Sequence, residues 1–257
     1  VIIIPEYEDD EPIDFAEDRS FSLENHGHIK GGLYGVYEGG QLEHVNILNQ
    51  STGRIEGGSA GLYLLRGGDI VNYGEIQGED AGIFIAFGTA NITHFGTLSA
   101  TGENDGDALR FGTNALGGSV TLHSTVDGGI GHYGDTSEAV ILLEEANEAS
   151  VGNIVFGDGG ILQNGGTWSL GDVTAGSIGI EDGELRLSGE VDVEGITIED
   201  DATLRVTGGA IETANLFNRG DLDFRDGEIA INGGLFDHTR ENSIRDFTIA
   251  GVAEDGN

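Results

Sequence analysis

Two arginines, each at the centre of a short apolar triplet, are the residues best suited to chemistry. Arg186 lies in "LRL" (185–187) and Arg205 in "LRV" (204–206). In a β-strand the flanking apolar residues face the core, so both guanidinium groups would face solvent. Neighbouring strands lie about 4.8 Å apart, so the two like charges would need compensation, for which Glu184 and Asp223 are the nearest candidates. The pair could bind an anion or form a surface charge ladder.

A glycine-rich motif suggests a cofactor, but its surroundings do not. "GIGHYG" (129–134) matches the pattern G-x-G-x-x-G. A dinucleotide site also needs a strand before the motif and a helix after it, and no such alternation surrounds this one. We interpret the segment as a corner loop. No Ser/His/Asp triad can be assigned either, because triads are spatial rather than sequential. We therefore expect no catalytic or cofactor-binding residues.

Metal-binding patterns are incomplete. "DLDFRDGE" (221–228) resembles a calcium loop, but Arg225 stands at its fifth position and Asn232 at its twelfth, where carboxylates are needed. His26 and His28 would share one face of a strand, but no third ligand lies nearby, so a pair lining a turn is the simpler interpretation. We expect no metal site, and calcium binding lacks a motif.

Acidic residues dominate the charge of the 257-residue chain. It holds 46 Asp and Glu against 11 Lys and Arg, for a net charge of −35 at pH 7. This excess disfavours nucleic acids and anionic membrane surfaces as partners. A solvated acidic surface is the simpler explanation, and specific cation binding is the alternative. Cysteine is absent, and no apolar run is long enough to cross a membrane as a helix.

The first part of the chain repeats itself. "NHGHIKGG" (25–32) aligns with three later segments, and the glycines shared by the four copies are Gly27, Gly53, Gly74 and Gly96, at spacings of 26, 21 and 22. A second box follows in each copy: "YGVY" (34–37), "AGLY" (60–63), "AGIF" (81–84) and, more loosely, "DALRFG" (107–112). Periods in the twenties indicate a solenoid, in which each turn buries the apolar residues of its neighbours.

A shorter repeat follows in residues 166–235. The apolar triplets are "WSL" (168–170), "LRL", "LRV" and "LDF" (222–224), which start 17, 19 and 18 residues apart. A second apolar series consists of Val173, Val191, Ile211 and Ile229, and a third of Ile178, Ile196 and Leu216. Each turn therefore has three short segments in which every second residue is apolar, which is typical of strands with one buried face.

These patterns predict an all-β fold, a right-handed parallel β-helix of about ten turns with three short sheets. The isoleucines would fill the core, and the glycines would lie at corners that need φ > 0 or lack room for a Cβ. Asn25 and Asn72, two residues before a repeat glycine, are expected to cap or ladder one corner. A helical bundle is excluded because 46 glycines would destabilise it.

The boundaries follow from these repeats. Residues 1–20 form an acidic arm with Pro5 and Pro12, residues 21–112 the long repeats, 113–165 irregular turns, 166–235 the short turns and 236–257 the C-terminal end. Residues 136–149 could form a short helix or a strand. We favour the strand, because "EAVIL" (138–142) resembles "DALRF" (107–111) and the stack of turns must continue through this segment.

The apolar run "VIII" (1–4) precedes Pro5 and a series of acids, as expected of a short strand that must not extend. It would cap the first turn near Leu23 and Ile29, or be donated to the last turn of another copy near Ile244 and Ile249. The chain does not begin with Met, so we expect a processed or excised piece.

Two segments resemble a known family. "NYGEIQGEDAGI" (72–83) and "LSGEVDVEGITIEDDATLRVTGG" (187–209) are similar to the passenger β-helices of autotransporters, and the resemblance covers about residues 21–235. It implies export and display at the surface of a Gram-negative bacterium, usually as an adhesin or stalk. The membrane barrel expected C-terminal in that family is not in this sequence.

The sequence thus favours an exported structural or adhesive protein that acts by contact. Its partners would be glycans or proteins of a cell surface or extracellular matrix, or copies of itself. One alternative is a filament or surface-layer subunit assembled head to tail by strand addition. Another is a polysaccharide lyase or hydrolase, because several β-helix enzymes of this kind use outward-facing arginines and carboxylates on one sheet.

Overall fold

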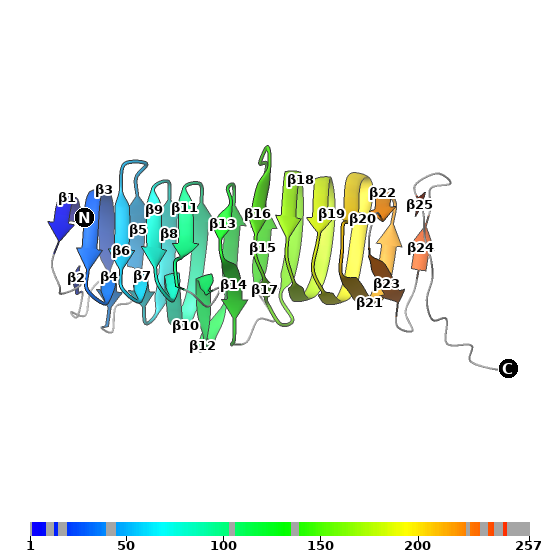
Figure 1. The fold of residues 1–257 in the computed structure, drawn as a ribbon. Helices are drawn as coiled ribbons and strands as arrows, with labels where there is room; N and C mark the ends of the chain where they lie inside the picture. Colours follow the sequence, from blue (N-terminus) through cyan, green and yellow to red (C-terminus); the bar gives the residue numbers. More distant parts are fainter. Residues whose placement is uncertain are drawn as a thin grey trace.

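The computed structural model is a rod of stacked turns (Figure 1). It describes residues 2–8, 13–14, 20–39, 45–102, 106–134, 139–224, 227–231, 236–238 and 244–245. Within these residues there is no helix, and the strands form a parallel β-solenoid of about nine turns. The all-β parallel fold is confirmed, with about one turn fewer than expected; the right-handed sense stays a prediction.

The strand pairings form three columns, one on each side of the solenoid. The first contains β1 (Ile2–Glu8), β3 (Phe21–Gly31), β5 (Val45–Asn49), β8 (Gly67–Asn72), β10 (Ala81–His94), β12 (Asp107–Leu122), β15 (Val140–Leu143), β18 (Gly160–Leu170), β19 (Val173–Leu187), β20 (Val191–Val206), β21 (Ala210–Asn218) and β24 (Phe236–His238).

The second column contains β6 (Arg54–Gly57), β9 (Glu75–Gly78), β11 (Thr97–Ala100), β13 (Val126–Asp127), β16 (Ala149–Val151), β22 (Asp221–Phe224) and β25 (Ile244–Arg245), with the ends of β3, β18, β19 and β20. The third contains β2 (Ile13–Asp14), β4 (Tyr34–Glu38), β7 (Ala60–Leu64), β14 (Gly129–His132), β17 (Ile154–Val155) and β23 (Glu228–Ile231), with the starts of β10, β12, β19, β20 and β21. The longest strands therefore bend around corners and serve more than one column.

The short turns stack in the predicted register. Trp168, Leu185, Leu204 and Leu222 lie opposite one another in successive strands. The series that begins at Val173 and the one that begins at Ile178 pair in the same way. Every member of the three series is buried, so the predicted core of this region is confirmed.

The long turns stack as predicted too. Ile29, Ile55, Ile76 and Leu98 form one buried column. The second boxes align through Val36, Leu62, Ile83 and Leu109. At the corner, a Cβ on Gly74 would collide with the carbonyl oxygen of Gly53, and one on Gly96 would collide with that of Gly74. The repeat glycines are therefore required because stacked backbones leave no room for a side chain.

A buried ladder of amides ties this corner together. Asn25 donates to Asn49 Oδ1 at 2.8 Å, and Asn49 donates to Asn72 Oδ1 at 2.8 Å. Asn72 Nδ2 contacts His94 Nδ1 at 3.1 Å, and His94 Nε2 contacts the carbonyl of Thr125 at 3.3 Å. The expected ladder is confirmed, with Asn49 and His94 as members that the sequence analysis did not name. All four side chains are fully buried.

The N-terminal arm forms a longer strand than expected. β1 continues past Pro5 to Glu8, with an irregularity in register between Ile4 and Glu6, so the expectation of a strand that stops at Pro5 is wrong. It pairs with β3, where Ile2 lies opposite Leu23 and Tyr7 opposite Ile29. β2 pairs with β4. Residues of the arm therefore stack on the first long turn within the same chain. On the C-terminal side, Ile244 pairs with Leu222, and Ile249 lies outside the described residues.

Two interpretations of the middle region are wrong. "GIGHYG" is not a corner loop, because its first four residues form the buried strand β14 between β12 and β17. "EAVIL" is not the equivalent of "DALRF": Val140–Leu143 pair with Ser119–Leu122, whereas residues 107–111 pair with β14. The choice of a strand over a helix is confirmed for Val140–Leu143, and residues 135–138 lie outside the described part.

A charge in the core should collapse the stack. Leu204→Asp buries a carboxylate between Leu185 and Leu222, and we expect it to cost more than about 4 kcal/mol and to unfold several turns together. Thermal unfolding followed by circular dichroism measures this. The control is Ser169→Asp, which places the same charge on the outer face opposite Arg186 and should change stability by less than about 1 kcal/mol. Equal melting of the two variants would contradict the register.

The ladder makes stability depend on pH. Burial lowers the pKa of His94 to about 4, below the roughly 6.5 of an unfolded chain. The stability contributed by the neutral imidazole is therefore complete above pH 6.5 and is lost as the pH falls to about 4, by on the order of 3 kcal/mol. His94→Asn extends the amide ladder and should remove this loss. Urea unfolding of parent, His94→Asn and the exposed control His26→Asn between pH 7 and 4 tests it. Parallel pH profiles for all three proteins would refute the assignment.

Candidate functional site

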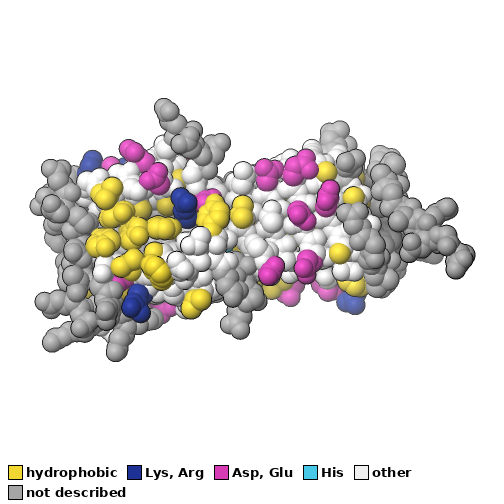
Figure 2. Space-filling view, turned by 90° about the horizontal axis from the view of Figure 1, so that it is seen from below, with side chains coloured by type: hydrophobic (Ala, Val, Ile, Leu, Met, Phe, Trp, Pro, Cys, Tyr) yellow, Lys and Arg dark blue, Asp and Glu magenta, His cyan; other side chains and the backbone are white. Residues whose placement is uncertain are grey.

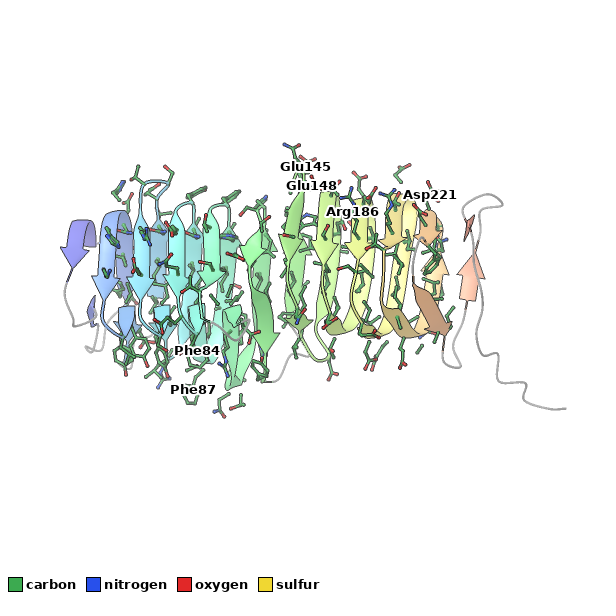
Figure 3. The ribbon with its side chains drawn as sticks, viewed as in Figure 1. Phe84, Phe87, Glu145, Glu148, Arg186 and Asp221 are labelled. Atoms are coloured by element: carbon green, nitrogen blue, oxygen red, sulfur yellow. The ribbon has the colours of Figure 1, made fainter. Side chains whose placement is uncertain are left out.

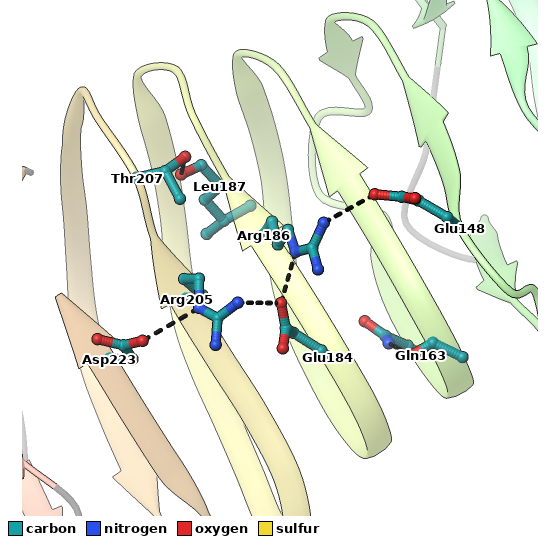
Figure 4. A network of polar contacts seen from close by, with 9 residues as sticks. Glu148, Gln163, Glu184, Arg186, Leu187, Arg205, Thr207 and Asp223 are labelled. Carbon is teal, nitrogen blue, oxygen red and sulfur yellow. Dashed lines mark hydrogen bonds and ion pairs between the residues drawn. The ribbon is translucent and has the colours of Figure 1, made fainter. Parts of the chain in front are cut away.

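The arginine row lies on the outer face of the second column (Figure 4). Arg186 and Arg205 are directly opposite each other, as predicted. Glu184 bridges them, since its Oε1 accepts from Arg186 Nε and, at 2.7 Å, from Arg205 Nη1. Arg186 also pairs with Glu148 at 3.0 Å and Arg205 with Asp223 at 3.0 Å.

This row alternates in sign along the rod. Three carboxylates surround two guanidinium groups, so Glu184 and Asp223 compensate the stacked arginines as predicted and Glu148 adds a third partner. The hydrogen bond to Glu184 raises the pKa of Arg186. Because the carboxylates outnumber the arginines, the row has no excess positive charge with which to hold an anion.

A second feature is a row of aromatic rings on the outer face of the third column. Tyr37, Tyr63 and Phe84 lie opposite one another on β4, β7 and β10. Tyr34 joins them, with its ring centroid 4.6 Å from that of Tyr63. Burial, followed by the neighbouring Tyr34 and Tyr37, raises the pKa of Tyr63, so its hydroxyl stays protonated and able to donate. We call Tyr34, Tyr37, Tyr63 and Phe84 the aromatic face.

One cation, Arg110, borders the aromatic face. Arg110 follows Phe84 in register, and its guanidinium carbon lies 5.8 Å from the Phe84 ring and 5.4 Å from the Tyr133 ring. Tyr133 donates to Asp107 at 2.7 Å. Figure 2 shows this side of the rod, with hydrophobic side chains gathered over the N-terminal half and acidic side chains prominent over the other half. Phe84 and Phe87 project on the opposite edge from Glu145 and Glu148 (Figure 3).

A third feature is a groove where the second column is interrupted. Among the described strands, β13 pairs only with β11 and β16 only with β18, although β13 and β16 are neighbours in the rod. The groove lies between them and is lined by residues 96–97, 123–128 and 146–152. Its volume is about 780 Å³, which falls in the range of roughly 300–1,000 Å³ for ligand sites.

The remaining predicted sites have simpler roles. His26 contacts Glu24 at 2.9 Å and His28 contacts Glu56 at 3.3 Å, so the two histidines engage different acids. Leu222 and Phe224 of the calcium-like segment are buried in β22, while Arg225 and Asn232 lie outside the described residues. Nowhere in the described ranges do three or more His, Asp or Glu side chains gather as they would to hold a metal.

Comparisons with known proteins leave the family open. No protein-family model, no curated protein and no solved structure matches the chain. The described residues include no helix that could cross a membrane. The geometry of the surface is therefore the basis for the functional proposal.

Neither the aromatic face nor the groove was predicted from the sequence. The face had a signal, because its rings end the boxes "YGVY", "AGLY" and "AGIF", at the position that faces outward when the residue before it is buried. The groove had no such signal in the sequence, because it forms where β13 and β16 do not pair with each other.

The arginine row should be structural. Arg205→Ala leaves Glu184 and Asp223, both less than one-third exposed, without their shared partner. We expect a loss of about 1 kcal/mol at low salt and less at high salt. The control Arg219→Ala removes an exposed pair with Glu199 and should cost under about 0.5 kcal/mol. Thermal melts at two NaCl concentrations measure both. A more stable Arg205→Ala protein would show that the row stores repulsion instead.

Proposed function

We propose that the protein is an exported β-solenoid that acts by contact at a cell surface, with the aromatic face as its adhesive surface. The observation that carries this proposal is the row of rings from Tyr37 to Phe84 on the outside of the third column. Contiguous apolar side chains on the surface of a soluble protein mark interaction sites, and Tyr and Arg are enriched in them. The resemblance to autotransporter passengers supports export.

A protein partner fits the aromatic face better than a glycan does. Tyr34 and Tyr37 are stacked at 5.5 Å with 15° between their planes, and Tyr63 lies against both. The rings therefore cover much of one another's faces and present edges and hydroxyl groups. Edges and hydroxyls suit the mixed apolar and polar surface of a protein, whereas a sugar packs on an open ring face.

The two alternatives lack such support. The lyase or hydrolase hypothesis rests on Arg186 and Arg205, and both are engaged by carboxylates in the structure. Filament growth by donation of the N-terminal strand would require β1 to leave its pairing with β3. Contact through the aromatic face requires neither change.

The test compares two pairs of ring substitutions. Beads coated with the purified protein are applied to cultured epithelial cells and to wells carrying fibronectin, laminin or collagen. Tyr63→Ser combined with Phe84→Ser should reduce attachment at least tenfold, because it removes the centre of the face. Tyr73→Ser combined with Phe217→Ser is the matched control, since these rings are 44% and 39% exposed and neither belongs to the aromatic face.

Circular dichroism melts verify that both double variants fold. If the parent attaches to none of these surfaces, the proposed function is wrong. If the parent attaches and the Tyr63/Phe84 variant attaches equally well, adhesion takes place elsewhere on the rod.

A further inference from the structure

We propose that the groove between β13 and β16 is a binding site for an uncharged oligosaccharide. This site is independent of the aromatic face, because it lies on the second column rather than the third. Its lining combines a ring, hydroxyl groups and carboxylates: His123, Ser124, Thr125, Asp127, Glu148 and Ser150.

The ring is the end of an aromatic column. Tyr73 and Phe95 stack at 4.8 Å with 10° between their planes, and Phe95 and His123 at 4.2 Å with 8°. These residues come from successive turns, so the column runs along the rod and Phe95 covers one face of the imidazole. His123 is the last ring of this column and lines the groove. A sugar packs the slightly positive C–H bonds of one side of its ring on the face of such a ring.

The polar lining suits a polyol. Ser124 donates to the carbonyl of Gly96 at 3.0 Å, and Thr125 Oγ1 accepts from the backbone N–H of Ser150 at 3.2 Å. Both hydroxyls keep further hydrogen-bonding capacity, since each oxygen has one O–H and two lone pairs. Hydroxyls that donate and accept match the hydroxyls of a sugar, and a carboxylate accepts from them more strongly than a neutral group.

The negative charge of the groove and of the whole chain favours an uncharged ligand. Arg186 compensates Glu148, and in the part of the chain that the structure describes Asp127 has no ion pair, so the groove has a small negative excess. The surrounding chain carries a net charge of −35, which repels uronates, sulfated sugars and phosphates. One uncompensated carboxylate is too little to make the groove a metal site.

A peptide strand is the competing ligand, because β13 and β16 have unpaired edges. Along the groove, however, Gly152 donates to the carbonyl of Gly128 at 2.9 Å, and Ser150 donates to Thr125, and all four residues line it. These bonds hold the two turns together, so an additional strand cannot enter between them. The groove is a hollow on the surface rather than a gap in the stack.

The experiment is titration of the ¹⁵N-labelled full chain with hexasaccharides of glucose, mannose and N-acetylglucosamine, and with a hexauronate as the anionic comparison. We expect at least one uncharged hexasaccharide to shift the amide signals of residues 123–128 and 146–152. The hexauronate should leave them unchanged. Saturation curves give the dissociation constants.

Substitutions then locate the site. His123→Ala and Asp127→Asn should each weaken binding at least tenfold. Tyr73→Ala, at the far end of the same aromatic column, and Glu145→Gln, an exposed carboxylate just outside the groove, should change it less than twofold. Melts of each variant confirm folding.

Three results would overturn the proposal: no binding of any uncharged hexasaccharide, tighter binding of the hexauronate, or binding that both groove substitutions leave intact. Signal shifts confined to residues around Tyr63 and Phe84 would also overturn it, and would instead assign the glycan to the aromatic face.

Discussion

Every turn of this protein must place its strands in register on the turn before it, and the rest of the structure depends on that constraint. Parallel strands lie about 4.8 Å apart, so along a paired column a residue is covered by the residue at the same position of the next turn. Apolar columns such as Ile29 to Leu98 exclude water because the rule holds without exception along them. The same rule leaves Gly53 and Gly74 no room for a Cβ and brings the amides of Asn25 and Asn49 within hydrogen-bonding distance.

Stacking residues of the same charge in successive turns is unfavourable, and this chain is strongly acidic. On the second column the solution is alternation: Glu184 lies between Arg186 and Arg205, and Asp223 follows. On the third column uncharged rings take the outward positions of the N-terminal turns, while Asp192 and Glu212 lie opposite each other further along. Two stacked carboxylates repel, and only solvent and salt screen that repulsion at the surface of the rod. The aromatic face is therefore the part of this side where contact with a partner meets the least charge.

Much of the fold and the arginine row could be predicted from the sequence, whereas the groove could not, for one physical reason. Repetition makes a column visible in a sequence, so the spacing of the apolar triplets aligns Trp168, Leu185, Leu204 and Leu222 correctly. Where turns differ in length, no periodicity shows which strands meet, and the sequence pattern places "GIGHYG" and "EAVIL" wrongly. β1 passes Pro5 because its pairing with β3 outweighs a local breaker, which is a long-range effect. No sequence pattern indicates the groove, because it forms where two neighbouring strands, β13 and β16, do not pair.

The missing pairing between β13 and β16 explains why a binding site would arise between these two strands. In a solenoid each turn contacts only its neighbours, so an interruption in one column leaves the other columns intact. Beside β13 and β16 the first and third columns continue, through β12 with β15 and through β14 with β17, and they carry the stack past the interruption. The interruption therefore frees the outward surface of two turns without dividing the core. It also leaves His123, the last ring of the column that begins at Tyr73, in the lining of the groove, so the interruption that the rod tolerates is also the place where a ligand would find a ring to pack on.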